Sequence, residues 1–344
     1  MSQHAKHTAP RPGRRPPLWR RFLRSTRRLA VLVLLGAIVL ALGTTAVTGA
    51  AHRDDSPGEP RVEEHVAALA AAAETAGAGA PDDVVHALQA HPDLIGAPER
   101  VEPYFDWIPE VAPPPAVIEP AADLDGLAGQ LEAAARATLQ RAVTVEADPE
   151  ARDAGAGTVP AERIRTLVAV GMEQVRALAE LDPEAAAAVR EDVLGDPEPS
   201  AEGPAVAAER CGAVSAAAGE AYRLAYLYEF GAVRRDTPRP QDAPDDAAAR
   251  WWTNATERAA LGDRLAGLLP DGCVALRESA YAVPADDDLA EAIRSAEARL
   301  ALSLRDAAAA ADPAARPALI ERAFAAVHLA AEGGWFELAA VDAG

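Results

Sequence analysis

Residues 206–233 read VAAERCGAVSAAAGEAYRLAYLYEFGAV, and this stretch decides the fold that the sequence predicts. Ala217, Leu224 and Leu227 recur at helical spacing, so the stretch predicts an amphipathic helix with one apolar stripe. Because three more stretches of the same kind follow, we expect residues 205–342 to form an all-α four-helix bundle. The three further stretches are 245–269, 286–311 and 317–341.

A layer of ionisable side chains interrupts the apolar stripes. One such residue falls near the midpoint of each predicted helix, so all four can meet in a single central layer whichever way each helix runs. Burying these groups costs free energy unless they are paired or used. This central polar layer is therefore the candidate site. Its members are Glu220, Arg258, Glu297 and His328.

Two interpretations of the layer are open. In the first, Arg258 pairs with Glu220 and Glu297, and His328 completes a metal-free network that fixes the helix register. In the second, iron or manganese is bound by Glu220, Glu297, His328 and Glu332. A di-iron centre needs two Glu-x-x-His motifs, which these helices lack, and the charge of Arg258 would repel a cation. The first interpretation, with no cofactor and no enzymatic reaction, is preferred.

The connection between the second and third bundle helices is long. It comprises the 15 residues from Asp271 to Ala285 and reaches about 50 Å when extended. A 26-residue helix is only about 39 Å long. The connection can therefore cross the whole bundle, as it does in ferritin-like folds.

Several short motifs carry a resemblance to a known family. The region of about residues 205–340 resembles an actinobacterial ferritin-like domain family of unknown function. The resemblance implies a ferritin-like bundle in an exported or membrane-attached protein, without an established activity. Arg258 stands where that family has a histidine on the second helix. The motifs are Ser279–Pro284, Ala290, Ala325-Ala326, Trp335, Glu220-Ala221-Tyr222 with Tyr226 and Tyr228, and Asp263–Leu265.

The two cysteines are placed so that they can pair. Cys211 falls near the start of the first bundle helix, and Cys273 falls just after the end of the second. These two points lie at the same end of an antiparallel helical hairpin. The sequence therefore predicts a disulfide, which fits an oxidising compartment.

The N-terminal region predicts a membrane anchor. Residues 1–28 carry nine basic and no acidic side chains and precede an uncharged run, 29–51. This run is long enough to span a bilayer, and the basic residues before it place the N-terminus in the cytoplasm. A retained single-pass anchor is favoured over a cleaved signal peptide. Both alternatives place the remaining chain outside the cytoplasm.

The chain after the basic tail is strongly acidic. The whole chain carries 33 basic and 53 acidic side chains. The part after residue 28 keeps 24 of the basic and all 53 of the acidic ones, a net charge of −29. This charge argues against nucleic acid as a partner. The expected partners are the membrane, through residues 29–51, and a protein of the cell envelope; the oligomeric state is left open. We expect a non-catalytic binding or assembly module, with a metal-binding or di-iron-type oxidative bundle as the alternative.

Residues between the anchor and the bundle predict further helices. His65, His86 and His91 lack the spacing of a shared metal site and are interpreted as ordinary surface or packing residues. Residues 52–120 predict a poorly packed, Pro-rich linker with short helices at 62–75 and 81–90. Residues 121–204 predict a helical region with helices at 123–146 and 160–193.

Overall fold

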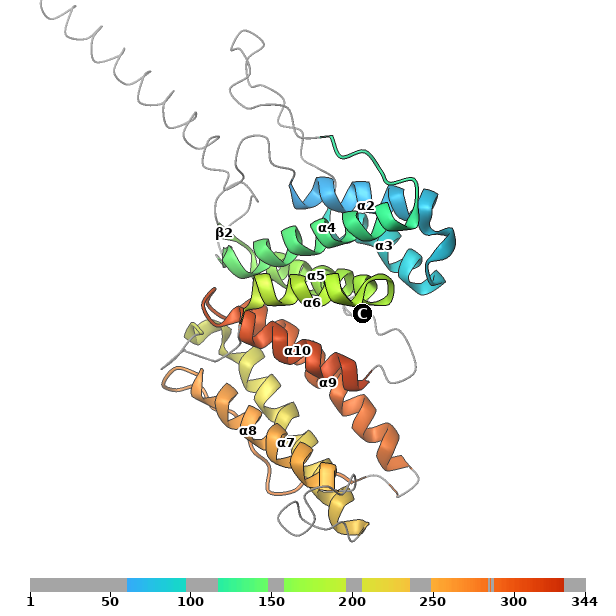
Figure 1. Ribbon diagram of the computed structural model, residues 1–344. Coiled ribbons are helices and arrows are strands. Elements are labelled where there is room, and N and C mark those ends of the chain that lie inside the picture. The colour runs from blue at the N-terminus through green and yellow to red at the C-terminus, as the bar shows by residue number, and fades with distance from the viewer. Residues whose placement is uncertain are drawn as a thin grey trace, which may run out of the picture. The chain divides into compact units, whose positions relative to one another are not determined.

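The computed structural model describes residues 61–96, 117–147, 158–195, 206–235, 249–283, 285 and 288–330. Within these residues the chain is helical apart from the connections, an isolated antiparallel bridge between Val206 and Ala311, and one parallel pairing of two-residue strands, β1 (Glu146–Ala147) and β2 (Thr158–Val159). The predicted all-α class is confirmed (Figure 1). The chain divides into two units, Met1–Arg53 and Asp54–Gly344, and every described residue belongs to the second.

Several predicted features fall outside the described residues. They are the basic tail, the anchor at 29–51, the Pro-rich stretch from 97 to 116, and Glu332. Of the helices that the structure describes, none combines the length and the apolarity needed to cross a membrane.

Five helices form the N-terminal helical group, with α5 at its centre. Helix α5 packs on α3, α4 and α6, and α2 packs on α3 and α4. Because neighbours surround it, α5 is buried on every side between Leu167 and Val175. The group comprises α2 (Val62–Ala76), α3 (Asp82–Ile95), α4 (Leu124–Thr144), α5 (Ala161–Leu181) and α6 (Pro183–Leu194), with a short 3-10 turn, η1 (Gly77–Gly79), after α2.

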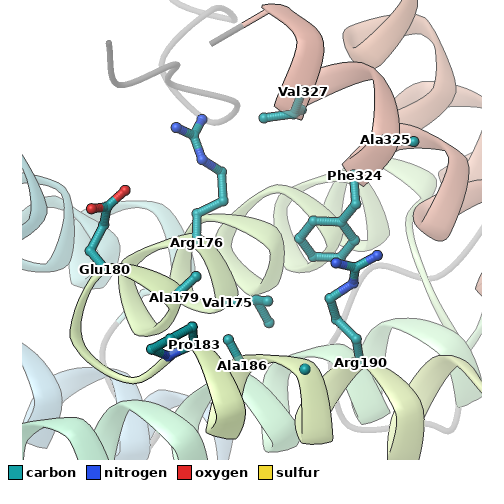
Figure 2. Close-up of a pocket in the computed structure, with 11 residues that line it drawn as sticks. Val175, Arg176, Ala179, Glu180, Pro183, Ala186, Arg190, Phe324, Ala325 and Val327 are labelled. Atoms are coloured by element: carbon teal, nitrogen blue, oxygen red, sulfur yellow. The ribbon is translucent and has the colours of Figure 1, made fainter. Parts of the chain in front are cut away.

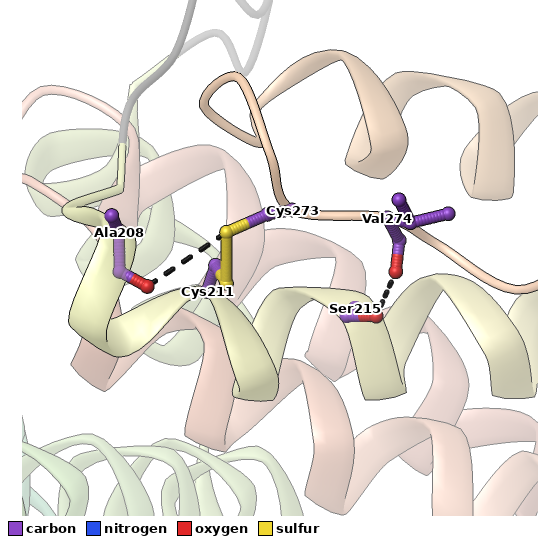
Figure 3. The surroundings of a disulfide bond; sticks show 5 residues. All are labelled: Ala208, Cys211, Ser215, Cys273 and Val274. Carbon is purple, nitrogen blue, oxygen red and sulfur yellow. Dashed lines mark hydrogen bonds between the residues drawn. A yellow bond between two sulfur atoms is a disulfide. The ribbon is translucent and has the colours of Figure 1, made fainter.

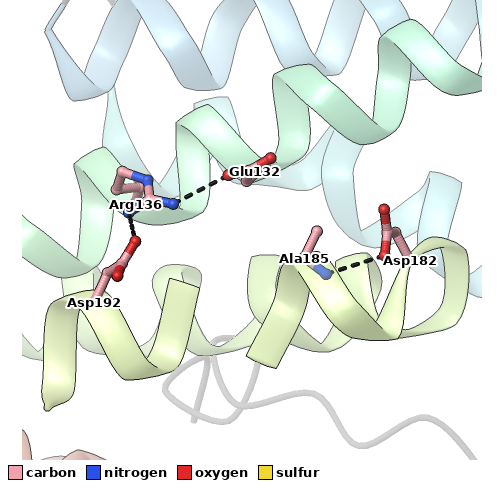
Figure 4. Close-up of polar contacts among 5 residues, drawn as sticks. All are labelled: Glu132, Arg136, Asp182, Ala185 and Asp192. Carbon is pink, nitrogen blue, oxygen red and sulfur yellow. Dashed lines mark hydrogen bonds and ion pairs between the residues drawn. The ribbon is translucent and has the colours of Figure 1, made fainter. Parts of the chain in front are cut away.

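A break divides the helix that the sequence predicts over 160–193, so that prediction is wrong. Helix α5 ends just before Asp182, and α6 begins at Pro183. The carboxylate of Asp182 accepts hydrogen bonds from the backbone N–H groups of Glu184 and Ala185, at 3.1 and 3.0 Å. Figure 4 shows the bond from Ala185. Proline suits the first helical position because an N–H there would have no helical partner. The break allows α6 to pack back on α4 and α5.

The helices predicted at 62–75 and 81–90 are confirmed as α2 and α3, but the expectation that this stretch packs poorly is wrong. Leu69 of α2 and Leu88 of α3 are 1% and 0% exposed and belong to the main apolar core. Helix α3 also continues past its predicted end. This extension places His91 inside a helix, on its buried face.

Four helices form the C-terminal helical group, which packs in the order α8, α7, α9, α10. A closed four-helix bundle would also pack α8 against α10, but in the described residues these two make marginal contact at most. Instead, α10 packs on α6 and α9 packs on α5. The four predicted helices are confirmed, as far as the described residues extend. They are α7 (Cys211–Arg234), preceded by the 3-10 turn η2 (Ala208–Arg210), α8 (Arg250–Gly267), α9 (Leu289–Ala310) and α10 (Arg316–Ala330).

The connection after α8 runs along α7, as the sequence predicts for a crossover. Cys273 at its start forms the predicted disulfide with Cys211, with their Cα atoms 6.3 Å apart (Figure 3). Further on, the ring of Tyr281 lies 5.6 Å from that of Tyr226, measured between centroids. The connection therefore advances along α7 before α9 begins.

A buried arginine joins the two helical groups. Arg316, at the start of α10, donates from Nε to the carbonyl of Ala311 at 3.0 Å, and from Nη1 to the carbonyls of Ala142, at 3.0 Å, and Val145. The last carbonyls of a helix such as α4 lack partners within the helix, so the guanidinium satisfies them. Burial lowers the pKa of Arg316 to about 10. The sequence marks this residue only as a lead-in to the last helix.

Candidate functional site: the Glu297 cluster

An arginine, a glutamate and a tyrosine meet inside the C-terminal helical group. Oε1 of Glu297, on α9, accepts hydrogen bonds from Nε and Nη2 of Arg258, on α8, at 3.2 and 3.1 Å. The hydroxyl of Tyr228, on α7, donates to the same oxygen at 3.0 Å. These three residues, the Glu297 cluster, connect three helices at one carboxylate.

The cluster is almost completely buried. The Glu297 side chain is 1% exposed and that of Arg258 is 11% exposed. Burial raises the pKa of Glu297, and the neighbouring Arg258 guanidinium opposes that change. Burial and the charge of Glu297 both raise the pKa of Tyr228 far above its usual value, so its phenol is a neutral donor at physiological pH. The second carboxylate oxygen of Glu297 has no hydrogen-bond partner among the described residues.

Aromatic packing positions the tyrosine of the cluster. Trp251, in the first turn of α8, meets the ring of Tyr228 edge-on at 5.8 Å between centroids. The guanidinium carbon of Arg235 lies 4.3 Å from the Trp251 ring centroid. Gly231 lies against the indole, and a side chain at this position would collide with it. The pairing of α7 with α8 therefore holds the Tyr228 hydroxyl against Glu297.

Of the three layer members whose side chains the structure describes, it brings together two, Arg258 and Glu297. Glu220 lies on α7 about two helical turns before Tyr228, where it pairs with Arg299 at 3.3 Å and with Arg223 at 3.9 Å. Its side chain is 23% exposed, so the assignment of Glu220 to a buried layer is wrong. His328 lies on α10, and its side chain is outside the described part of the structure.

The predicted layer omitted Tyr228, which the structure places in the cluster. At the sequence level Tyr228 stands out only among the motifs that carry the family resemblance, with Tyr222 and Tyr226. One sequence signal could have indicated that Tyr228 faces the interior of the group. It lies eight residues after Glu220, which places it on the same side of the helix about two turns later.

Among the described residues, the donor set does not match the metal interpretation; the His328 and Glu332 side chains lie outside them. Within the described residues, no group of three or more His, Cys, Asp or Glu side chains is arranged to hold a metal ion. Glu220 pairs away from the cluster, and the guanidinium of Arg258 occupies the position beside Glu297 that a cation would need. The cluster as described is an ion pair with an added hydroxyl donor.

A second buried pair lies in the N-terminal helical group. Nε2 of His91 is 3.0 Å from Oε2 of Glu173, and the two side chains are 1% and 4% exposed. The other ring nitrogen of His91 has no hydrogen-bond partner among the described residues. His86 is exposed, whereas His65 is half-buried, and burial lowers the pKa of His65. His91 is thus a packing residue, as predicted, but one with a specific carboxylate partner.

An apolar groove lies between α5, α6 and α10 (Figure 2). It has a volume of about 560 Å³, and Val175, Phe324 and Val327 line it. Arg190 lies at one side, where it donates two hydrogen bonds to Glu321 and its guanidinium carbon lies 5.0 Å from the Phe324 ring centroid. Glu321 neutralises this arginine, and a second arginine, Arg176, lines the groove together with Glu180.

Comparisons of the chain with protein-family models, with curated proteins and with solved structures find no match.

Proposed function

We propose that the chain is a membrane-anchored, extracytoplasmic helical protein whose C-terminal helical group is ferritin-like and acts as a non-catalytic binding or assembly module. The uncharged run at 29–51, with its basic flank, supports the anchor. The crossover along α7 supports a ferritin-like arrangement, because this connection distinguishes such folds from simple up-and-down bundles.

The position of Arg258 carries the non-catalytic part of the proposal. A ferritin-like metal centre needs carboxylates that face a cation. Here the buried carboxylate of Glu297 faces a guanidinium at 3.1 Å. The pair fixes the register of α8 against α9, which suits a scaffold whose outer surface does the binding.

Metal analysis of the full chain tests this proposal. The protein is expressed with added iron and manganese, purified without chelator and assayed for both metals by mass spectrometry. We expect far less than one metal ion per chain, both in the wild type and in Glu297→Gln. One or two ions per wild-type chain, lost in Glu297→Gln, would establish the metal-binding alternative.

Fractionation of cells tests the anchor. We expect the full chain to sediment with membranes and to be released by detergent but not by high salt. A chain without residues 29–51 serves as the control and is expected in the soluble fraction. Release of a shortened product that lacks the N-terminal residues would instead identify a cleaved signal peptide.

A further inference from the structure

The apolar groove between α5, α6 and α10 lies beside the end of α10. At the start of α10, Arg316 binds the carbonyls of Ala142 and Val145 at the end of α4, and β1, which follows α4, pairs with β2, which leads into α5. The start of α10 is therefore close to the start of α5. The groove residues are at the opposite end of α5 and in the last two turns of α10. Helix α10 thus runs along α5 toward the groove, and the chain after Ala330 leaves the helix beside it.

Helix α10 leaves one wall of the groove uncovered. Arg190, on α6, meets Glu321 and Phe324 of α10, and Figure 2 shows α10 on one side of the groove with α5 and α6 on the other. Pro183 and Ala187 line the α6 side and are nevertheless exposed. The turns of α6 before Arg190 therefore present apolar surface to a segment that continues past the end of α10.

The segment that follows α10 has the composition of an apolar anchor. Residues 331–344 read AEGGWFELAAVDAG and lie outside the described residues. Aromatic residues make up only 4% of the chain, yet Trp335 and Phe336 are adjacent here and Leu338 follows them. An aromatic side chain buries about 150–250 Å² when it packs. The two glycines before Trp335 permit the backbone to turn, because glycine adopts conformations that other residues avoid.

The segment is long enough to reach the groove. Val327 lines the groove, and Trp335 follows it by eight residues. Eight residues span about 12 Å as a helix and about 26 Å when extended, so Trp335 can return to the groove in either form. The groove volume of about 560 Å³ lies in the range of cavities that hold a drug-sized molecule. It can therefore take the indole and an apolar neighbour.

We propose that this groove is the docking site of the chain's own segment 331–344, with Trp335 as the anchor. Covalent continuity favours this occupant, because a short linker gives an effective concentration on the order of millimolar. A separate partner would instead have to offset the full cost of association. Docking covers Pro183 and Ala187 and adds a contact between the two helical groups. The inference is independent of the proposed function.

Cross-linking between paired cysteines tests the inference. Ala339→Cys places a thiol in the segment, and Ala187→Cys places one in the groove. Ala188→Cys is the matched control, because Ala188 is the next residue of α6 and is also exposed, but it does not line the groove. The full chain in detergent is treated with a short, rigid bis-maleimide, and the linked peptides are identified by mass spectrometry. We expect position 339 to link to position 187 faster than to position 188.

Two further variants identify the anchor. Trp335→Ala removes the ring that packs in the groove, so it should abolish the difference in rate between positions 187 and 188. Glu337→Gln is the matched control within the segment and should leave the difference in place. Circular dichroism and retention of the Cys211–Cys273 disulfide report that each variant is folded.

Three results would overturn the inference. One is equal linking of position 339 to positions 187 and 188, and another is an unchanged difference in Trp335→Ala. The third is linking between chains, detected when isotope-labelled and unlabelled protein are mixed, because the occupant would then be the segment of a second copy. None of these results changes the metal content, so failure here is distinguishable from failure of the non-catalytic proposal.

Discussion

The N-terminal and C-terminal helical groups are held together by different means. In the N-terminal group, helix α5 is buried continuously from Val168 to Val175, and apolar neighbours cover all its sides. In the C-terminal group, helix α8 lies at the edge and packs mainly on α7. Its buried residues are Ala255, Leu261, Gly262 and Leu265.

Specific links add to the packing of α8 on its single main neighbour, α7. The disulfide fixes the segment that follows α8, and Arg258 connects α8 to α9. The hydroxyl of Tyr222 also donates to Asp263 at 2.9 Å. The attachment of an edge helix such as α8 therefore depends partly on a disulfide, an ion pair and a hydrogen bond. Losing one such contact should therefore matter more in the C-terminal group than in the N-terminal group.

The largest expected effect comes from the disulfide. Replacing Cys211 and Cys273 by serine removes a link between residues separated by 62 positions, which the chain-entropy model values at about 4 kcal/mol. The free energy of unfolding, measured by urea denaturation, should fall by about this amount. In hydrogen exchange, α7 and α8 should lose protection while α5 keeps it. Equal loss in both groups would contradict the distinction drawn between them.

Glycine substitutions compare the packing of the two groups. A Cβ on Gly171 would lie 2.7 Å from the buried side chain of Leu139 and 3.4 Å from its backbone nitrogen, whereas one on Gly262 would lie 2.5 Å from the Tyr222 ring. Each change to alanine should destabilise by about 1–3 kcal/mol. Gly171→Ala should cost more, because Leu139 is surrounded on all sides.

The control for this comparison is Gly129→Ala on α4, where a Cβ would meet nothing within 4 Å. Because alanine is the better helix former, this variant should gain about 0.5–1 kcal/mol. Thermal unfolding of the three variants provides the measurement. If Gly262→Ala cost more than Gly171→Ala, the C-terminal group would be the more tightly packed one.

The smallest expected effect is a change in pH dependence. Burial raises the folded-state pKa of Glu297 above its unfolded value. The corresponding stabilisation is complete below the ordinary glutamate pKa and is lost as the pH rises through the raised value. Glu297→Gln should remove this decline from the curve of unfolding free energy against pH. Glu220→Gln, on the half-exposed glutamate, is the control and should leave the decline in place.

Sequence patterns predicted the features that depend on local periodicity and chain length. The helices, the pairing of Cys211 with Cys273, and the contact of Arg258 with Glu297 follow from apolar spacing, from the ends of the hairpin and from the cost of an unpaired buried charge. The crossover followed from its length alone. These features require little knowledge of which helices are neighbours.

The features that the sequence did not predict depend on three-dimensional neighbours. A polar residue is visible when it lies on an apolar stripe. Glu173 instead falls on the polar stripe of α5 between Thr166 and Arg176, so it did not stand out as the buried partner of His91. Glu220 lies on an apolar stripe, yet the position of α9 brings Arg299 to it at the surface. Arg316 binds carbonyls of α4, a helix more than a hundred residues earlier in the chain.

A double-mutant cycle at positions 258 and 297 tests the central claim, that Arg258 neutralises Glu297 without a metal. Arg258→Leu, Glu297→Leu and the double variant are compared with the wild type by urea denaturation, before and after chelator treatment. We predict that Arg258→Leu costs about 3–5 kcal/mol and that the double variant is close to the wild type. The coupling energy is then at least as large as the cost of Arg258→Leu, and chelator has no effect. Additive single effects, an Arg258→Leu variant as stable as the wild type, or destabilisation of the wild type by chelator would contradict the account.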